Sequence, residues 1–154
     1  MAATLVLGYD GSDCSKAALQ RTAELASQIA DATVVVVYAY EFSIGYVPTG
    51  MAESPLMMSA EFDDHVELVR GYADEQVRQA AEELVKAGVR AEPRVEEGRP
   101  VEVLLQAAKD TGAALIVVGS HGEGAVSAAF MGSTALKLLH HSELPVLVVP
   151  RRKS

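Results

Sequence analysis

The chain alternates short aliphatic runs with longer segments of helical periodicity. The aliphatic runs predict five strands, at residues 5–9, 33–40, 89–96, 115–118 and 146–149. Four consecutive valines in the second run are typical of a parallel strand that is buried on both faces. The run at 89–96 alternates only weakly and is the least regular of the five.

Between these runs, apolar residues recur every three or four positions. This spacing predicts helices at 12–30, 61–87, 100–110 and 132–141. Ser12 or Asp13 is suited to cap the first helix, and Pro100 suits the first turn of the third. The segment 41–60 follows neither period and contains two glycines and two prolines, so we expect a long loop there.

Five strands alternating with four helices predict a doubly wound, five-stranded parallel α/β sheet of Rossmann-like type. We expect the strand order 3-2-1-4-5, helices on both faces, and one domain over residues 1–154. In such sheets, ligands bind beyond the carboxyl ends of the strands, where the strand order reverses. The loops after the first and fourth strands are therefore expected to flank a binding crevice.

Charge and composition narrow the choice of partners. The chain has 13 basic and 21 acidic residues, a formal charge of −8, one cysteine, and no apolar run long enough to span a bilayer. An acidic surface repels nucleic acid and anionic lipid. A single cysteine excludes an internal disulfide framework and suits a reducing compartment. We expect a cytoplasmic protein that binds neither nucleic acid nor membrane.

The loop after the fourth strand carries the most informative motif. Gly119 and Gly122 are followed, after nine residues, by Gly132-Ser133-Thr134 at the predicted start of the last helix. Glycines let the backbone approach a ligand closely, and a helix start offers free amide donors and the positive end of the helix dipole. This combination predicts an anion site, with phosphate as the natural ligand.

In these residues the chain resembles the universal stress protein family, whose ATP-binding members carry G-x2-G-x9-G-[S/T]. The resemblance covers nearly all of the chain and includes Tyr9-Asp10-Gly11-Ser12, Gly98-Arg99-Pro100 and the closing run 144–150. It implies that the glycines, Ser133 and Thr134 hold the ribose and phosphates of ATP. It also implies that Asp10 lies near the phosphates and Mg²⁺, that Tyr38-Ala39 lines the adenine slot, and that Gly98 borders the pocket.

Two of the candidate residues have a second interpretation. Asp10 beside a triphosphate requires a divalent cation or a compensating donor, but it also fits a simple turn or capping aspartate. His121 either contacts the nucleotide or faces solvent. The candidate binding residues are Asp10, Ala39, Gly98, Val118, Gly119, His121, Gly122, Gly132, Ser133 and Thr134.

The sequence favours a binding module over an enzyme. It contains neither a G-x4-G-K-[S/T] phosphate loop nor a G-x-G-x-x-G dinucleotide fingerprint after the first strand. We expect ATP and Mg²⁺ as ligands, a role in stress responses, and at most slow hydrolysis. The alternatives are a true ATPase or phosphotransferase that uses Asp10 and His121, and a dimeric interaction protein that binds cyclic AMP or no nucleotide.

The last strand predicts how the protein assembles. In the order 3-2-1-4-5 the run Val146–Val149 forms an edge that is apolar on both faces and uncharged. Bare edges of this kind pair with another chain unless something covers them. We therefore expect a symmetric homodimer that pairs the final strands antiparallel, which the family resemblance also implies. The alternative is an edge covered by the C-terminal tail.

Overall fold

The computed structural model describes residues 2–41, 55–121 and 131–151, with side chains described from residue 63 in the second segment. Its sheet is entirely parallel and has the strand order β3-β2-β1-β4-β5. The strands are β1 (Thr4–Gly8), β2 (Thr33–Tyr40), β3 (Arg90–Glu97), β4 (Leu115–Gly119) and β5 (Val146–Val149). The predicted fold class and strand order are confirmed.

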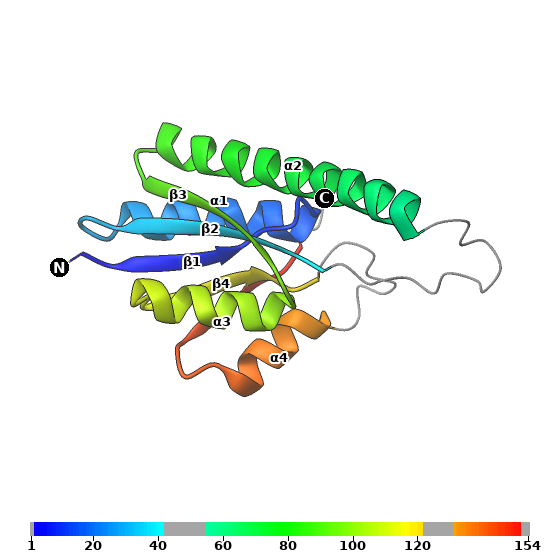
Figure 1. Cartoon of the computed structure of the whole chain (residues 1–154). Helices are drawn as coiled ribbons and strands as arrows, with labels where there is room; N and C mark the ends of the chain where they lie inside the picture. The colour runs from blue at the N-terminus through cyan, green and yellow to red at the C-terminus, as the bar shows by residue number, and fades with distance from the viewer. Residues whose placement is uncertain (1, 42–54, 122–130, 152–154) are drawn as a thin grey trace.

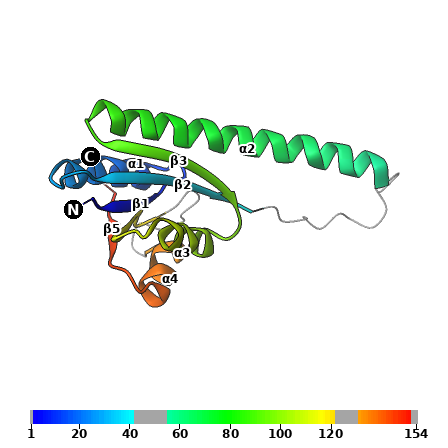
Figure 2. The same cartoon turned by 60° about the vertical axis from the view of Figure 1, so that its left-hand side comes forward.

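Four helices in the described part of the chain cover the two faces of this sheet (Figures 1 and 2). They are α1 (Asp13–Ser27), α2 (Pro55–Lys86), α3 (Pro100–Thr111) and α4 (Ser133–His141). Alternate valines of β2 point into different layers: Val34 and Val36 pack with α1 and α2, and Val35 and Val37 pack with α3 and α4. All four are at most 3% exposed, which explains the unbroken valine run.

Helix α2 begins earlier than the sequence analysis predicted. Its first residue is Pro55, which lies inside the loop expected at 41–60, whereas the periodicity placed the start of the helix at Glu61. Proline is tolerated in a first helical turn because its missing amide hydrogen has no intrahelical partner there. The buried stripe of α2 runs from Ala73 to Leu84, and Figure 2 shows the N-terminal half of the helix extending beyond the sheet.

The two outer strands of the sheet have different surfaces. β3 carries charged side chains and Pro93, and its Arg94 forms ion pairs with Glu96 and with Asp110 of α3. β5 has only aliphatic residues, of which Val146, Leu147 and Val148 are half-buried. Charge and proline are devices that discourage pairing at an edge, and β5 has neither.

None of the helices within the described ranges combines the length and apolar character that crossing a membrane requires.

Candidate functional site

A pocket of about 410 Å³ lies at the carboxyl ends of β1, β2 and β4, where the strand order reverses. One part of its lining is aliphatic and comes from β2, β4 and α3. The other part is polar and comes from the turn after β1, the residues after β4 and the start of α4. The lining residues are Gly8, Tyr9, Asp10, Ser15, Val37, Ala39, Pro100, Leu104, Val118, Gly119, Ser120, His121, Gly132, Ser133, Thr134 and Ala135.

Gly119 brings the end of β4 against the first turn of α1. A Cβ atom at this position would lie 2.7 Å from both the carbonyl carbon and the Cβ atom of Cys14. Real Cβ atoms essentially never come so close to backbone, so a side chain here would push α1 away from the sheet. Glycine at 119 is therefore required by packing, independently of any ligand.

The N-terminus of α1 is capped by its own residues. The side-chain oxygen of Ser12 accepts a hydrogen bond from the amide of Ser15 at 3.2 Å, and the Ser15 hydroxyl donates to the Ser12 carbonyl at 2.9 Å. One carboxylate oxygen of Asp10 accepts from the Ser12 amide at 2.9 Å. These contacts form an Asx turn followed by a serine N-cap.

The N-terminus of α4 has no such cap. Its N-cap residue is Gly132, and among the described residues no side chain makes a capping hydrogen bond to the helix. The Gly132 amide donates to the Ser120 carbonyl at 2.6 Å, which fixes the start of α4 beside the end of β4. In an α-helix the first-turn amides, here those of residues 133–135, have no intrahelical acceptor. These donors and the positive end of the helix dipole face the pocket, because all three residues line it.

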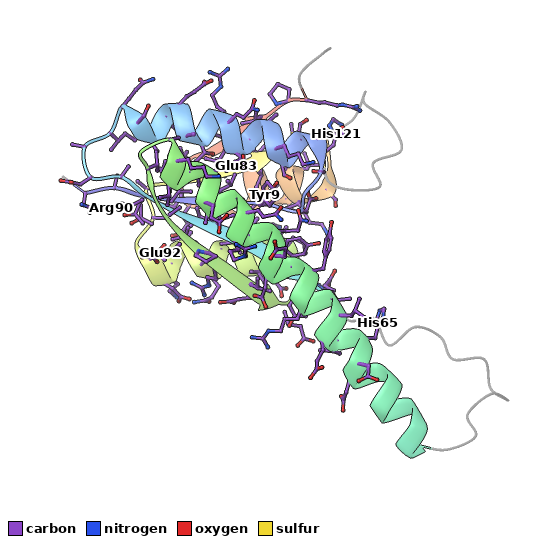
Figure 3. The ribbon with its side chains drawn as sticks, turned by 90° about the horizontal axis from the view of Figure 1, so that it is seen from above. Tyr9, His65, Glu83, Arg90, Glu92 and His121 are labelled. Atoms are coloured by element: carbon purple, nitrogen blue, oxygen red, sulfur yellow. The ribbon has the colours of Figure 1, made fainter. Side chains whose placement is uncertain are left out.

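His121 lies beside the first turn of α1 at this end of the molecule (Figure 3). Its Nδ1 atom is 2.8 Å from the hydroxyl of Ser120. Its Nε2 atom is buried and has no hydrogen-bond partner in the described part of the chain. An orphaned buried nitrogen of this kind needs an explanation, because leaving it unpaired costs free energy.

The pocket has little fixed positive charge. Its described lining contains no lysine or arginine, and its titratable side chains are Tyr9, Asp10, and His121. Burial raises the pKa of Tyr9 above the usual tyrosine value, and the charges of Glu83, Asp10 and Tyr72 raise it further. Tyr9 therefore stays neutral at physiological pH, and Asp10 is the only carboxylate in the described lining.

The described residues contain no cluster of three or more His, Cys, Asp or Glu side chains that could hold a metal ion. Mg²⁺ usually takes one or two carboxylates from the protein and completes its coordination with phosphates and water. Asp10 fits that limited role only if a ligand supplies the phosphate oxygens. A metal site independent of a phosphorylated ligand does not fit these residues.

The structure brings most of the candidate residues together. Those that line the pocket are Asp10, Ala39, Val118, Gly119, His121, Gly132, Ser133 and Thr134. Gly98 does not line it: its amide donates to the Tyr40 carbonyl at 2.9 Å, and its φ of 145° turns the chain from β3 into α3. Gly122 lies outside the described residues.

Tyr38 is not part of the pocket, although the resemblance had placed it there with Ala39. Successive side chains of a strand point to opposite faces, so Tyr38 lies on the α2 side of β2 and meets Tyr72 edge to face, with 6.4 Å between ring centroids. Sequence reasoning also missed Ser15, Ser120 and Leu104 as lining residues. The apolar period of α3 identified Leu104 as a buried residue, but it gave no indication that its side chain reaches the pocket.

Fold and pocket together define a class: a doubly wound α/β protein whose pocket, at the point where the strand order reverses, includes the start of α4. The sequence matches the universal stress protein family over residues 1–150, and the chain belongs to that family. It is 37% identical over 147 residues to a universal stress protein of Thermus aquaticus, covering 95% of this chain and 97% of the relative.

Solved structures have the same fold. The universal stress protein UspA of Lactobacillus plantarum superposes with a TM-score of 0.79 at 19% identity, covering 96% of this chain and 97% of that one. A universal stress protein in complex with cAMP superposes with a TM-score of 0.65 at 25% identity, covering 97% and 98% of the two chains.

Proposed function

We propose that this protein binds ATP with Mg²⁺ in the pocket and acts as a nucleotide-dependent regulatory module in a stress response. The observation that carries this proposal is the division of the pocket into an aliphatic part, with Val37, Ala39 and Leu104, and a polar part at the uncapped start of α4. A nucleotide has the matching division between a flat base and charged phosphates. The volume of about 410 Å³ lies within the usual range for small-molecule sites.

The start of α4 is the proposed phosphate site. Backbone amides at an uncapped helix start bind anions without needing a basic side chain. The hydroxyls of Ser133 and Thr134 lie in the same lining and add two further donors. The acidic charge of the whole chain does not oppose this, because the local donors lie much closer to the ligand than the surface carboxylates do.

Asp10 is the proposed contact to Mg²⁺. A carboxylate and a triphosphate repel each other in one pocket unless a cation lies between them. Bound Mg²⁺ would supply positive charge to the phosphates. The hydrogen bond that the Asp10 Oδ1 atom accepts from the Ser12 amide restrains this carboxylate in the lining of the pocket.

We expect hydrolysis to be slow at most. A general base must be able to take a proton from water, and in the described lining only Asp10 and His121 are candidates. In the proposed complex Asp10 is occupied by the cation, and His121 Nδ1 is already engaged by Ser120. A regulatory role needs only that the bound and free states differ, so we place this protein among nucleotide-binding modules of the cytoplasm rather than among enzymes.

Titration calorimetry tests the proposal directly. Wild-type protein is expected to bind ATP in the presence of Mg²⁺, and Asp10→Asn is expected to weaken Mg-ATP binding about 10-fold, the size of one lost charged contact. Without Mg²⁺ the same variant should bind ATP more tightly than wild type, because a repulsive charge is gone. Asp13→Asn is the matched control, since Asp13 is exposed and outside the pocket lining.

Absence of ATP binding at millimolar concentration would overturn the proposed function. Equal ATP affinity of Asp10→Asn and wild type, both with and without Mg²⁺, would show that Asp10 does not contact the cation. That result would not contradict nucleotide binding in the pocket.

Cyclic AMP is the second candidate ligand. A pocket whose described lining has no lysine or arginine suits a ligand with one negative charge, and a related universal stress protein was solved in complex with cAMP. Cyclic AMP needs no cation, so its affinity should be the same with Mg²⁺ and with EDTA. Tighter binding of cyclic AMP than of Mg-ATP in parallel titrations would favour this candidate.

We also propose that the protein forms a homodimer through β5. Its outer edge carries no charge, and Val146, Leu147 and Val148 are each half-buried in the isolated chain. The carbonyls of Pro145 and Val149 accept hydrogen bonds from the amides of Ile116 in β4 and of Ser120 just after it. By strand alternation, the backbone groups of Val146 and Val148 therefore point outward. An antiparallel copy of β5 would satisfy these groups.

Sedimentation analysis of two proline variants tests this edge. Val148→Pro removes an outward amide and should shift the protein toward monomer while β4–β5 pairing persists. Leu147→Pro is the matched control: it removes an amide that faces β4 and should mainly lower the free energy of unfolding. A wild-type protein that is monomeric at high micromolar concentration would contradict the dimer.

A further inference from the structure

Ser120 joins three parts of the site. Its amide donates to the Val149 carbonyl of β5 at 2.8 Å, and its carbonyl accepts from the Gly132 amide at 2.6 Å. Its hydroxyl lies 2.8 Å from His121 Nδ1. Ser120 is only 9% exposed, so these contacts are largely shielded from water. The residue therefore couples the orientation of the His121 ring to the start of α4.

The neighbours of the Ser120 hydroxyl decide the direction of its hydrogen bond. The hydroxyl has one hydrogen and lies between His121 Nδ1 and the Cys14 sulfur, which is 3.8 Å away. An imidazole nitrogen is a much better acceptor than a thiol sulfur, so the hydroxyl donates to Nδ1. The Cys14 thiol then lies beside the lone pairs of the Ser120 hydroxyl oxygen and can act as a weak donor to them. A neutral imidazole that accepts at Nδ1 carries its hydrogen on Nε2.

The Nε2–H group is thus a donor, and it has no acceptor among the described residues. His121 lines the pocket, and Ser120 ties it to the uncapped start of α4. An acceptor that enters this polar part of the pocket would supply the missing partner. A phosphoryl oxygen held by the α4 amides meets that requirement.

We propose that Ser120 is a positioning residue that sets His121 to donate from Nε2 to a phosphoryl oxygen of the bound nucleotide. This inference rests on the proposed function and deepens it. It assigns the histidine a neutral donor role, so the contact does not depend on a positively charged ring. Because Nε2 has almost no accessible surface in the free protein, the contact requires the surroundings of this atom to open when the nucleotide binds.

The first test uses the free protein and no nucleotide. A ring N–H that is buried exchanges slowly with water and gives a resolved imidazole proton signal in NMR spectra. Wild type is expected to show this signal for His121, with the nitrogen shifts of the Nε2–H tautomer. Ser120→Ala should lose the signal, whereas Ser27→Ala, an exposed serine far along α1, should keep it. An Nδ1–H tautomer in wild type would overturn the assignment.

The second test is a double-mutant cycle measured by titration with Mg-ATP. Ser120→Ala is expected to bind about 3- to 10-fold more weakly, the size of one hydrogen bond. His121→Gln keeps a side-chain N–H donor that needs no orienting hydroxyl. In the His121→Gln background, adding Ser120→Ala should therefore cause no further loss of Mg-ATP affinity. His140→Gln, an exposed histidine of α4, is the control for the substitution itself.

The outcomes separate this inference from the proposed function. Equal losses from Ser120→Ala in both backgrounds would show that the hydroxyl acts through folding alone and would overturn the positioning role. If Ser120→Ala weakened the binding of adenosine and of Mg-ATP by the same factor, the contact would be to the ribose, and the assignment to a phosphoryl oxygen would be overturned. Failure of wild type to bind any nucleotide would overturn the proposed function, and with it the role of His121 toward phosphate.

Discussion

The helices α1 and α4 both begin at the same pocket, yet only α1 is capped by the chain itself. The Ser12 side chain accepts from the Ser15 amide, and Asp10 accepts from the Ser12 amide, which places a carboxylate beside the start of α1. α4 has Gly132 as its N-cap and receives no side-chain cap from the part of the chain that the structure describes. Two helix starts with similar dipoles therefore differ in whether their amides remain available to a ligand.

This difference divides the pocket into two electrostatic halves. An anion is expected to gain less at α1, where the Ser12 and Ser15 amides are already engaged and a carboxylate lies nearby, than at α4. A cation is favoured beside Asp10 for the same reason. The comparison teaches that the location of a phosphate site depends less on the dipole of a helix than on what already occupies its first turn.

The largest expected effect is a loss of stability where the end of β4 packs against the start of α1. Gly119→Ala places a Cβ atom 2.7 Å from the backbone of Cys14 in the first turn of α1. We expect the free energy of unfolding to fall by about 3 kcal/mol, which lowers Tm by roughly 6 to 12 °C. Thermal and urea denaturation measure this change in the free energy of unfolding.

Gly71→Ala is the matched control for this substitution. Gly71 lies inside α2 with no atom within 4 Å of the added Cβ, so alanine should raise stability by about 0.5 to 1 kcal/mol. If Gly119→Ala is as stable as Gly71→Ala, the close packing of α1 on β4 is not as described.

The next effect comes from making α4 resemble α1. Gly132 has φ −63° and ψ 154°, an extended conformation that any residue adopts, so Gly132→Asp supplies both a cap and a negative charge. ATP affinity should fall about 100-fold, because the carboxylate occupies the amides that would bind phosphate. Stability should be unchanged or slightly higher. Gly132→Asn adds the cap without the charge, so its ATP affinity should lie between those of wild type and Gly132→Asp. Unaltered ATP affinity in Gly132→Asp would argue against a phosphate site at α4.

The smallest effect comes from making α1 resemble α4. Ser12→Ala removes the cap on the Ser15 amide and should lower the free energy of unfolding by about 1 kcal/mol. ATP affinity should change less than about 2-fold, because Asp10 still keeps anions away from this helix start. Ser27→Ala at the far end of α1 provides the baseline in the same denaturation and titration measurements. A marked gain of ATP binding in Ser12→Ala would mean that capping alone decides between the two helices.

Much of the fold could be predicted from residue patterns because burial leaves a clear periodicity. The bounds of β2 follow from its valines, and the parallel sheet follows from the alternation of strands and helices. The start of α2 could not be predicted in the same way. Its first turns extend beyond the sheet, so no apolar period marks them, and Pro55 reads equally well as a loop residue.

The candidate site was predictable where backbone chemistry defines it. Glycine spacing identified Gly119, Gly132 and the start of α4, because these positions need a close approach or an uncapped amide. Side chains that reach the pocket from a distance left no local signal. Leu104 resembles any core residue of α3, and Ser120 resembles any loop serine, until the structure shows what lies beside them.

The central claim is that a phosphate binds the amides at the start of α4 and not those of α1. Amide NMR spectra of ¹⁵N-labelled protein, titrated with Mg-ATP, test it most directly. The account predicts large shifts for the amides of Ser133, Thr134 and Ala135, while the capped amide of Ser15 changes little. Binding of ATP that shifts Ser15 and leaves the three α4 amides unchanged would contradict it.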